Sequence, residues 1–319
     1  MPWYWMFGNG RLKRAFKQAR TSLSVQRLEE RITPATVETI RNFLAFDPTF
    51  AGGVRIATGD ENGDGASDII AAAGPGATPH VKVFDGRTLT EIRSFLAYGD
   101  DFRGGISVAA GDVNGDGTAD IITGSGAGSA AHIKAFDGKT GLEIRSFTAF
   151  SPSFLGGVNV AAADVTGDGI ADIIAGAGAG GGPQVTVFDG KTGAEVRSFY
   201  AFDSTFFGGV NVSVGDVTGD GVADIIAGAG AGGGPHVKVF DGKTGAEVRS
   251  FYAFDSNFFG GVSVSTGDLN GDGVAEIFAG AGPGGGPHIK VFDGKTNVEL
   301  RSEFAFDPEF AGGGEFHGR

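Results

Sequence analysis

The chain has 319 residues, no cysteine and a net charge of −13, and 59 of its residues are glycine. The absence of cysteine excludes a disulfide framework and a thiolate metal site. Residues 1–36 carry a net charge of +5, whereas the remainder carries 18 Lys/Arg and 36 Asp/Glu, a net of −18. An acidic body argues against nucleic acid as a partner and favours cations. No apolar run approaches the roughly 18 residues of a membrane span, so no transmembrane segment is predicted.

The first 36 residues form a basic segment of different composition. Aromatic residues come first and the basic stretch follows, the reverse of the order in a secretory signal peptide. Residues 11–31 have an amphipathic pattern that is compatible with a helix. We interpret this segment as an unusual export or targeting signal, and a basic tail without structure is the alternative.

From residue 37 to residue 314 the sequence is a tandem array with a period of 52 residues, followed by a tail at 315–319. The array contains no insertions, and residues 157–208 and 209–260 differ at only seven of 52 positions. A fixed period of this length is typical of repeat architectures. The predicted repeats are 53–104, 105–156, 157–208, 209–260 and 261–312.

Each repeat contains four short strand candidates. In the third repeat these are 157–162, 171–177, 183–189 and 194–202, rich in Val, Ile and Phe and bounded by Gly, Asp and Pro. Four antiparallel strands in a repeat of this length match one blade of a propeller. The sequence therefore predicts an all-β protein, a β-propeller of five four-stranded antiparallel blades.

The number of blades leaves one alternative open. The fourth-strand motif occurs six times, because an extra copy stands at 37–46, whereas the first three strands occur five times. A closed propeller needs only one strand of this kind to complete its ring, so one copy is spare. The alternative is that the array is part of a six- or seven-bladed ring.

A loop rich in acids follows the first strand of every repeat, with the pattern D-x-[N/T]-x-D-G-x-x-[D/E]. Calcium prefers six to eight oxygen ligands, and oxygens at positions 1, 3 and 5 of a tight turn can converge on one ion. The carbonyl at position 7 and the acid at position 9 would complete the shell. The predicted ligands are Asp60, Asn62, Asp64, Ala66 and Asp68; Asp112, Asn114, Asp116, Thr118 and Asp120; Asp164, Thr166, Asp168, Ile170 and Asp172; Asp216, Thr218, Asp220, Val222 and Asp224; and Asp268, Asn270, Asp272, Val274 and Glu276.

The cofactor expected from these loops is Ca²⁺, about one ion per repeat and up to five in all. An EF-hand is disfavoured, because Thr123 stands where the glutamate at position 12 belongs and a strand follows the loop. A plain turn without metal is the other alternative, since Asp and Gly are common in turns. A hydroxyl is a poorer calcium ligand than an amide, so Thr166 and Thr218 predict weaker binding in the third and fourth repeats.

Several other motifs suggest functions that the sequence context disfavours. GAGAGG at 176–181 fits a dinucleotide-binding pattern, but a strand follows it instead of the required helix. DGKTG at 189–193 predicts a hairpin turn rather than a phosphate loop. His80 and its equivalents suggest a ring of imidazoles at the propeller axis, which Gln184 interrupts. The repeated Glu and Arg of the fourth strand, such as Glu195 and Arg197, are interpreted as cross-blade or surface ion pairs.

Residues 206–235 resemble the FG-GAP repeat, which is also grouped with the VCBS type of bacterial repeat. The FGG and GAG…GP ends bracket a calcium-type loop, as that family requires, and the resemblance covers about 37–314. It implies a propeller with calcium between the first two strands of each blade. Such propellers occur in cell-surface adhesion proteins and in large exported bacterial proteins. Residues 27–35 are similar to a signature that precedes such arrays in some bacterial surface proteins, which supports export.

The expected function is that of a non-enzymatic, calcium-binding, exported repeat protein at the cell surface, serving adhesion or interaction. Its expected partner is a protein or glycan surface ligand, or another propeller fragment or chain. The alternatives are a propeller-type glycosidase or lyase and a pure structural scaffold. An enzyme is disfavoured, because the polar motifs are copied in every repeat and no nucleophile–base pair stands out.

Overall fold

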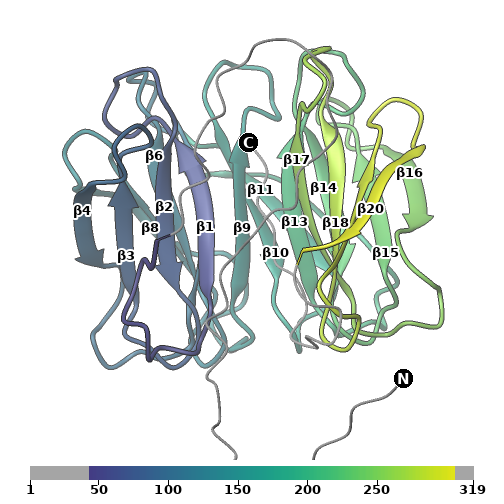
Figure 1. The fold of residues 1–319 in the computed structure, drawn as a ribbon, viewed down its shortest axis with the longest axis horizontal. Helices are drawn as coiled ribbons and strands as arrows, with labels where there is room; N and C mark the ends of the chain where they lie inside the picture. The colour runs from purple at the N-terminus through teal and green to yellow at the C-terminus, as the bar shows by residue number, and fades with distance from the viewer. Residues whose placement is uncertain (1–42, 306–319) are drawn as a thin grey trace, which may run out of the picture. The chain divides into compact units, whose positions relative to one another are not determined.

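The computed structural model describes residues 43–305, which form five four-stranded sheets (Figure 1). The expectations for residues 1–36 and 315–319, and for most of the extra strand at 37–46, lie outside this range. Blade 1 contains β1 (Val54–Gly59), β2 (Asp68–Ala73), β3 (His80–Phe84) and β4 (Glu91–Leu96). Blade 2 contains β5 (Ile106–Gly111), β6 (Asp120–Ser125), β7 (His132–Phe136) and β8 (Glu143–Thr148). Blade 3 contains β9 (Val158–Ala163), β10 (Asp172–Ala177), β11 (Gln184–Phe188) and β12 (Glu195–Tyr200). Blade 4 contains β13 (Val210–Gly215), β14 (Asp224–Ala229), β15 (His236–Phe240) and β16 (Glu247–Tyr252), and blade 5 contains β17 (Val262–Gly267), β18 (Glu276–Ala281), β19 (His288–Phe292) and β20 (Glu299–Phe304).

Every blade is an antiparallel meander in which each strand pairs with the next one along the chain. The pattern of β-branched and aromatic residues explains the strands, and hairpin turns such as 189–193 explain the antiparallel order. The second strands, such as β10, are buried along their whole length because both faces of the sheet are covered. The described residues include no helix long and apolar enough to cross a membrane.

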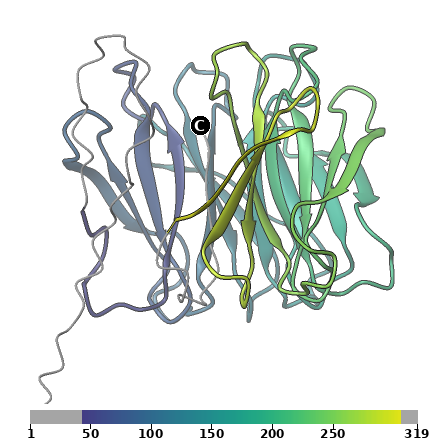
Figure 2. The same ribbon diagram turned by 45° about the vertical axis from the view of Figure 1, so that its right-hand side comes forward.

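The blades stand in a ring, which confirms the predicted five-bladed propeller. The first strands of consecutive blades contact one another from β1 to β5, β9, β13 and β17, so they form the inner wall. Figure 1 shows β1, β9 and β17 near the centre and the outer strands β4 and β16 at the flanks. Figure 2 brings blade 5 forward in yellow, with the purple blade 1 on one side of it.

Aromatic pairs join each blade to the next. Phe95 of β4 packs against Phe136 of blade 2 with ring centroids 4.7 Å apart. The same pair recurs at the next three joins, with centroid distances of 4.8, 4.6 and 4.9 Å. Apolar clusters that span two blades surround these pairs. Because aromatic packing contributes both buried area and about 1 kcal/mol of specific geometry, these contacts are the main apolar join between blades.

In blades 1 to 4 an arginine of the fourth strand also reaches the next blade. Arg93 donates to the carbonyl oxygens of Asp137 and Gly138, and Arg197 donates to that of Gly242 at 2.9 Å. In four blades the glutamate two residues earlier pairs instead with a lysine of the neighbouring strand, such as Lys238 at 2.7 Å from Glu247. The glutamates thus form surface ion pairs, but with lysine and not with arginine, because the arginine donates to carbonyl groups across the join.

The residue at the end of the extra fourth-strand motif packs on blade 1. Phe46 lies with its ring centroid 5.9 Å from that of His80, and the ammonium of Lys82 lies over its ring. Phe202 and Phe254 contact the histidines of blades 4 and 5 in the same way. The end of the extra motif thus takes the position on blade 1 that a preceding blade takes on the others.

The join between blade 5 and blade 1 carries fewer of these contacts. Glu303 replaces the joining phenylalanine of blade 5, and the exposed side chain of Arg301 makes no hydrogen bond to a described residue. Leu269 is 52% exposed, although the equivalent valines of blades 2 to 4 are fully buried. Val54 of β1 is 41% exposed, whereas its equivalent Ile106 is fully buried. The apolar edges of the first and last blades are therefore only partly covered.

Glu61 is an exception within the join between blades 1 and 2. It occupies the position of the buried valines Val113, Val165 and Val217, and it is itself only 2% exposed. Neither of its carboxyl oxygens has a hydrogen-bond partner among the described residues. Burial raises the pKa of this carboxyl to about 9, against the opposing effect of Arg93. The folded protein therefore keeps Glu61 protonated at neutral pH, at a cost in stability.

We predict that Glu61→Val stabilises the protein by about 1 to 3 kcal/mol, because it removes an unpaired carboxyl group from the interior. The pKa of Glu61 is higher in the folded than in the unfolded protein. The free energy of unfolding of the unmutated protein therefore falls as the pH rises from the unfolded to the folded pKa, by up to about 1.4 kcal/mol per pH unit. The gain from Glu61→Val should be larger at pH 8 than at pH 5, as measured by denaturant unfolding.

Glu61→Gln is the matched control, because it removes the ionisable group and keeps a buried polar one. It should abolish the part of the pH dependence that Glu61 causes and yield less stability than Glu61→Val. An equal gain from Glu61→Val at both pH values would contradict the protonated, buried state of Glu61.

Candidate functional site

Each acidic loop is a tight turn built around its first aspartate. In the second repeat, Asp112 Oδ1 accepts the backbone N–H of Gly115 at 2.7 Å, and Oδ2 accepts that of Gly117 at 2.7 Å. Both glycines have a positive φ, of 78° and 84°, which side chains disfavour. Asn114 Oδ1 and Asp116 Oδ1 each accept an N–H two residues further on. The turn thus holds the oxygens of positions 1, 3 and 5 together. The other repeats form the same bonds at positions 1 and 5, whereas Thr166 and Thr218 do not form the bond that Asn forms at position 3.

The acid at position 9 has a different role. Asp120 is fully buried, and its two oxygens accept the N–H groups of Val113 and Gly138, both at 3.0 Å. Asn114 Nδ2 also donates to Asp120 Oδ1. Burial outweighs these hydrogen bonds and raises the pKa of Asp120 to about 6. This acid therefore fixes the loop to the turn between the third and fourth strands.

The five acids at position 9 share this buried position, whereas the acids at position 5 are exposed. Within residues 43–305, no group of three or more His, Cys, Asp or Glu stands in an arrangement that could hold a metal. In four repeats a basic side chain of the nearby turn contacts the acid at position 5. Lys243 lies 2.9 Å from Asp220 and Lys139 lies 3.2 Å from Asp116. These exposed pairs partly neutralise the loop and contribute little stability.

Consecutive loops are linked to one another by backbone hydrogen bonds. The carbonyl of Asp60 accepts the N–H of Ala119 at 3.0 Å, and that of Asp112 accepts the N–H of Ala171 at 2.9 Å. The same bond joins the third loop to the fourth and the fourth to the fifth. The first residue of each loop is therefore held directly by the end of the next loop, so the five loops form one chain at one end of the propeller.

The glycine-rich motifs have a structural role, because they stand where two backbone segments lie close together. Residues 176–181 lead into β11 and not into a helix. A Cβ on Gly178 would lie 2.1 Å from the carbonyl oxygen of Gly156 in the same blade, and one on Gly176 would lie 2.7 Å from that of Val210 in the next. The backbone thus approaches closely here, both within a blade and across a join, and no side chain fits.

The repeated histidines do not form a ring at the axis. They lie on the third strands, and each contacts a serine of the fourth strand, as His236 does with Ser250 at 2.8 Å. Gln184 makes the same contact with Ser198 in blade 3. The axial histidine hypothesis is wrong because the first strands, and not the third, form the inner wall.

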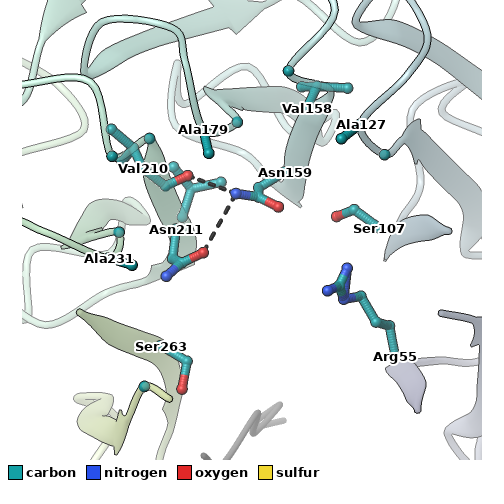
Figure 3. Close-up of a pocket in the computed structure, with 18 of the residues that line it drawn as sticks. Arg55, Ser107, Ala127, Val158, Asn159, Ala179, Val210, Asn211, Ala231 and Ser263 are labelled. Carbon is teal, nitrogen blue, oxygen red and sulfur yellow. Dashed lines mark hydrogen bonds between the residues drawn. The ribbon is translucent and has the colours of Figure 1, made fainter. Parts of the chain in front are cut away.

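A cavity of about 450 Å³ lies at the axis and is lined by residues of all five blades. Figure 3 shows the second residue of each first strand projecting into it. These equivalent residues are Arg55, Ser107, Asn159, Asn211 and Ser263. Between them the wall consists of valine, alanine, proline and glycine. A mostly apolar cavity of this size with a few polar groups is typical of small-molecule sites.

Sequence analysis alone missed this cavity, although a signal was present. In the alignment of the repeats, the second residue of the first strand is Arg, Ser, Asn, Asn and Ser, while Val or Ile stands on both sides of it. A polar position that varies between two apolar ones on an inner strand marks the side chain that faces the axis. Glu61 had a similar signal, because it stands among aliphatic equivalents.

Comparison with protein families and curated proteins agrees with the repeat assignment. A family model described as FG-GAP-like repeat matches residues 48–123 and 216–279. An 88-residue segment is 33% identical to integrin alpha-V of Gallus gallus, which corresponds to 25% of this chain and 8% of the integrin. The chain therefore spans only a small part of the length of that relative.

Solved structures with a similar fold include the WD40 repeats of RRP9, with a TM-score of 0.50 and 11% identity over 79% of this chain and 64% of that one. The rhamnogalacturonan lyase YesW matches with a TM-score of 0.46 and 18% identity over 79% of this chain and 51% of that one. At these identities the likeness concerns the fold alone. The chain therefore contains FG-GAP-like repeats, and they lie within a propeller of five blades.

Proposed function

We propose that the protein is a calcium-stabilised, non-enzymatic interaction module that is exported and acts at the cell surface. The observation that carries this proposal is the set of five loops with the same turn and the same oxygen-bearing positions, linked to one another at one end of the propeller. An acidic body without disulfides gains most from a cation at these points.

The loops fit calcium through positions 1, 3, 5 and 7. In the second repeat these would be the side-chain oxygens of Asp112, Asn114 and Asp116 and the carbonyl of Thr118, a donor set of oxygen alone, as calcium prefers. Asp120 would act mainly as the anchor that holds the loop in place, since it is fully buried and hydrogen-bonded to the turn at Gly138. The bound ion would supply positive charge to the turn, where Lys139 now contacts Asp116.

A non-enzymatic role is supported by the composition of the axial cavity. Its described lining includes no Asp, Glu, His, Cys, Tyr or Lys, and so lacks the groups that act as general acids and bases. The adhesive or interaction role rests on the FG-GAP repeats and on the segment shared with an integrin alpha chain. We propose a protein or glycan at the cell surface as the partner, or another propeller chain, and export as the route to it.

Calcium should raise the melting temperature of the purified chain, and EDTA should lower it. At free calcium tenfold above the dissociation constant, each occupied loop adds about 1.4 kcal/mol, so several loops change the free energy of unfolding substantially. Differential scanning calorimetry during a calcium titration measures the effect. Magnesium at the same concentration is the control. A melting temperature that is the same in calcium, magnesium and EDTA would refute the structural calcium sites.

The residue at position 3 should set the strength of individual loops. Asn114→Thr should reduce the calcium-dependent rise in melting temperature, and Thr166→Asn should increase it, because an amide oxygen binds calcium better than a hydroxyl. Each change should be worth at most about 1.4 kcal/mol at tenfold excess calcium. Thr205→Asn makes the same substitution outside the loops, at a position where the fourth repeat carries Asn257. It should leave the calcium response unchanged.

A further inference from the structure

The acid at position 5 of each loop has one oxygen that the turn itself does not use. In the second repeat, Asp116 Oδ1 accepts the N–H of Thr118 at 2.9 Å, whereas Oδ2 lies 3.2 Å from the ammonium of Lys139. The same ammonium donates to the carbonyl oxygen of Asp116 at 3.0 Å. A basic side chain thus holds the oxygen of position 5 that the turn leaves available for a cation.

This contact recurs in three other repeats. Lys243 lies 2.9 Å from Asp220 Oδ2 and donates to the carbonyl oxygen of the same residue at 3.1 Å. In each of these repeats Oδ1 of the acid accepts the N–H two residues further on. The other two basic residues are Arg87, 3.3 Å from Asp64 Oδ2, and Lys295, 3.7 Å from Asp272 Oδ2. The contact is therefore a repeated feature of the loops and not an isolated surface pair.

The fold brings each basic residue to its loop. Lys139 follows Gly138 in the turn between β7 and β8, and the N–H of Gly138 donates to the buried Asp120 of the loop at 3.0 Å. The side chains of Lys139 and Lys243 are 53% and 48% exposed, so their ammonium groups can turn into water. The backbone of the turn is thus fixed to the loop, whereas the charge at the end of the side chain can leave it.

The third repeat lacks this contact. Lys191 stands at the position of Lys139 in an identical DGKTG turn, yet among the described residues it forms no ion pair with Asp168. Asp168 Oδ1 still accepts the N–H of Ile170 at 2.9 Å, so the turn of the loop is the same. The third loop therefore presents its position-5 oxygen without an ammonium beside it.

A calcium ion in a loop and an ammonium on the same carboxylate would repel each other. Two cations close together interact unfavourably even in water, and position 5 has a single negative charge to share between them. The exposed ion pair is weak, so a divalent ion that binds the loop can displace the basic side chain.

We propose that Arg87, Lys139, Lys243 and Lys295 are competitors of calcium that are built into the chain. Each one holds the position-5 acid in the calcium-free loop and leaves it when the ion binds, so it sets the calcium concentration at which that loop fills. This inference rests on the proposed binding of calcium and adds its regulation. It also ranks the two loops with Thr at position 3: the third loop, which has no competitor, binds calcium more tightly than the fourth.

Isothermal titration of the full chain with calcium compares two triple variants. The first removes three competitors and carries Lys139→Gln, Lys243→Gln and Lys295→Gln. The second removes the same number of charges from the same blades, at lysines that pair with glutamates of the fourth strands, and carries Lys134→Gln, Lys238→Gln and Lys290→Gln. We expect the affected loops of the first variant to bind calcium about two- to fivefold more tightly, as the free energy of an exposed pair allows. The second should bind calcium like the unmutated protein, because about 0.15 M salt screens the change in net charge.

Lys191→Gln is a further control within the same turn motif. It makes the same substitution where the contact is missing, and it should leave the calcium affinity unchanged. A gain equal to that of Lys139→Gln would show an effect of charge near the loops and would overturn the role of the contact.

The reactivity of the lysines in the unmutated protein decides the question if a triple variant fails to fold. Acylation with acetic anhydride, followed by mass spectrometry, should modify Lys139 and Lys243 faster in calcium than in EDTA, because the displaced amines are no longer held by a carboxylate. Lys191 should react at the same rate in both. Rates for Lys139 and Lys243 that do not depend on calcium would contradict their displacement.

The outcomes separate this inference from the calcium sites themselves. Equal affinities of the two triple variants, or weaker calcium binding by the first, would overturn the competition and leave the calcium sites standing. Absence of calcium binding by the unmutated protein would refute the calcium sites and this inference together.

Discussion

Each blade is a sheet with two apolar faces, and a sheet of this kind is stable only when both faces are covered. In this protein each face is covered mainly by the neighbouring blade, through the aromatic pairs and the arginines that reach across the joins. The requirement explains why the array repeats without insertions, since a displaced residue would disturb two joins at once. It also explains the partial exposure of Val54 and Leu269, which belong to the edges of the first and last blades.

The acidic loops place many carboxylates at one end of the ring, and the structure accommodates them in different ways. The acids at position 1 are surrounded by backbone N–H groups, the acids at position 9 are buried and hydrogen-bonded, and several acids at position 5 contact a basic side chain. Three different environments thus distribute the negative charge within one turn. Because the loops are hydrogen-bonded in series, the conformation of one loop affects the first residue of the loop before it.

Most of the fold could be predicted from the sequence, because the strand patterns and the period of 52 residues are local properties. The turns, the glycine contacts and the order of strands followed from the same patterns. The partners of Arg93 and Arg197, the burial of Asp120 and the axial cavity did not, since each depends on which edges meet when blades pack. For the same reason, the histidines could not be placed from the repeat alone, because a repeat shows which residues are equivalent but not which strand faces the axis.

The inner wall has one property that concerns the evolution of such proteins. At the second position of each first strand, the side chain faces the cavity, whereas Val158 and Val160 on either side of Asn159 are buried in the joins. Five single residues, one per blade, therefore supply the polar side chains of the cavity lining. Duplication of similar repeats supplies the framework, and a change at one position per repeat is sufficient to vary the polar groups at the axis.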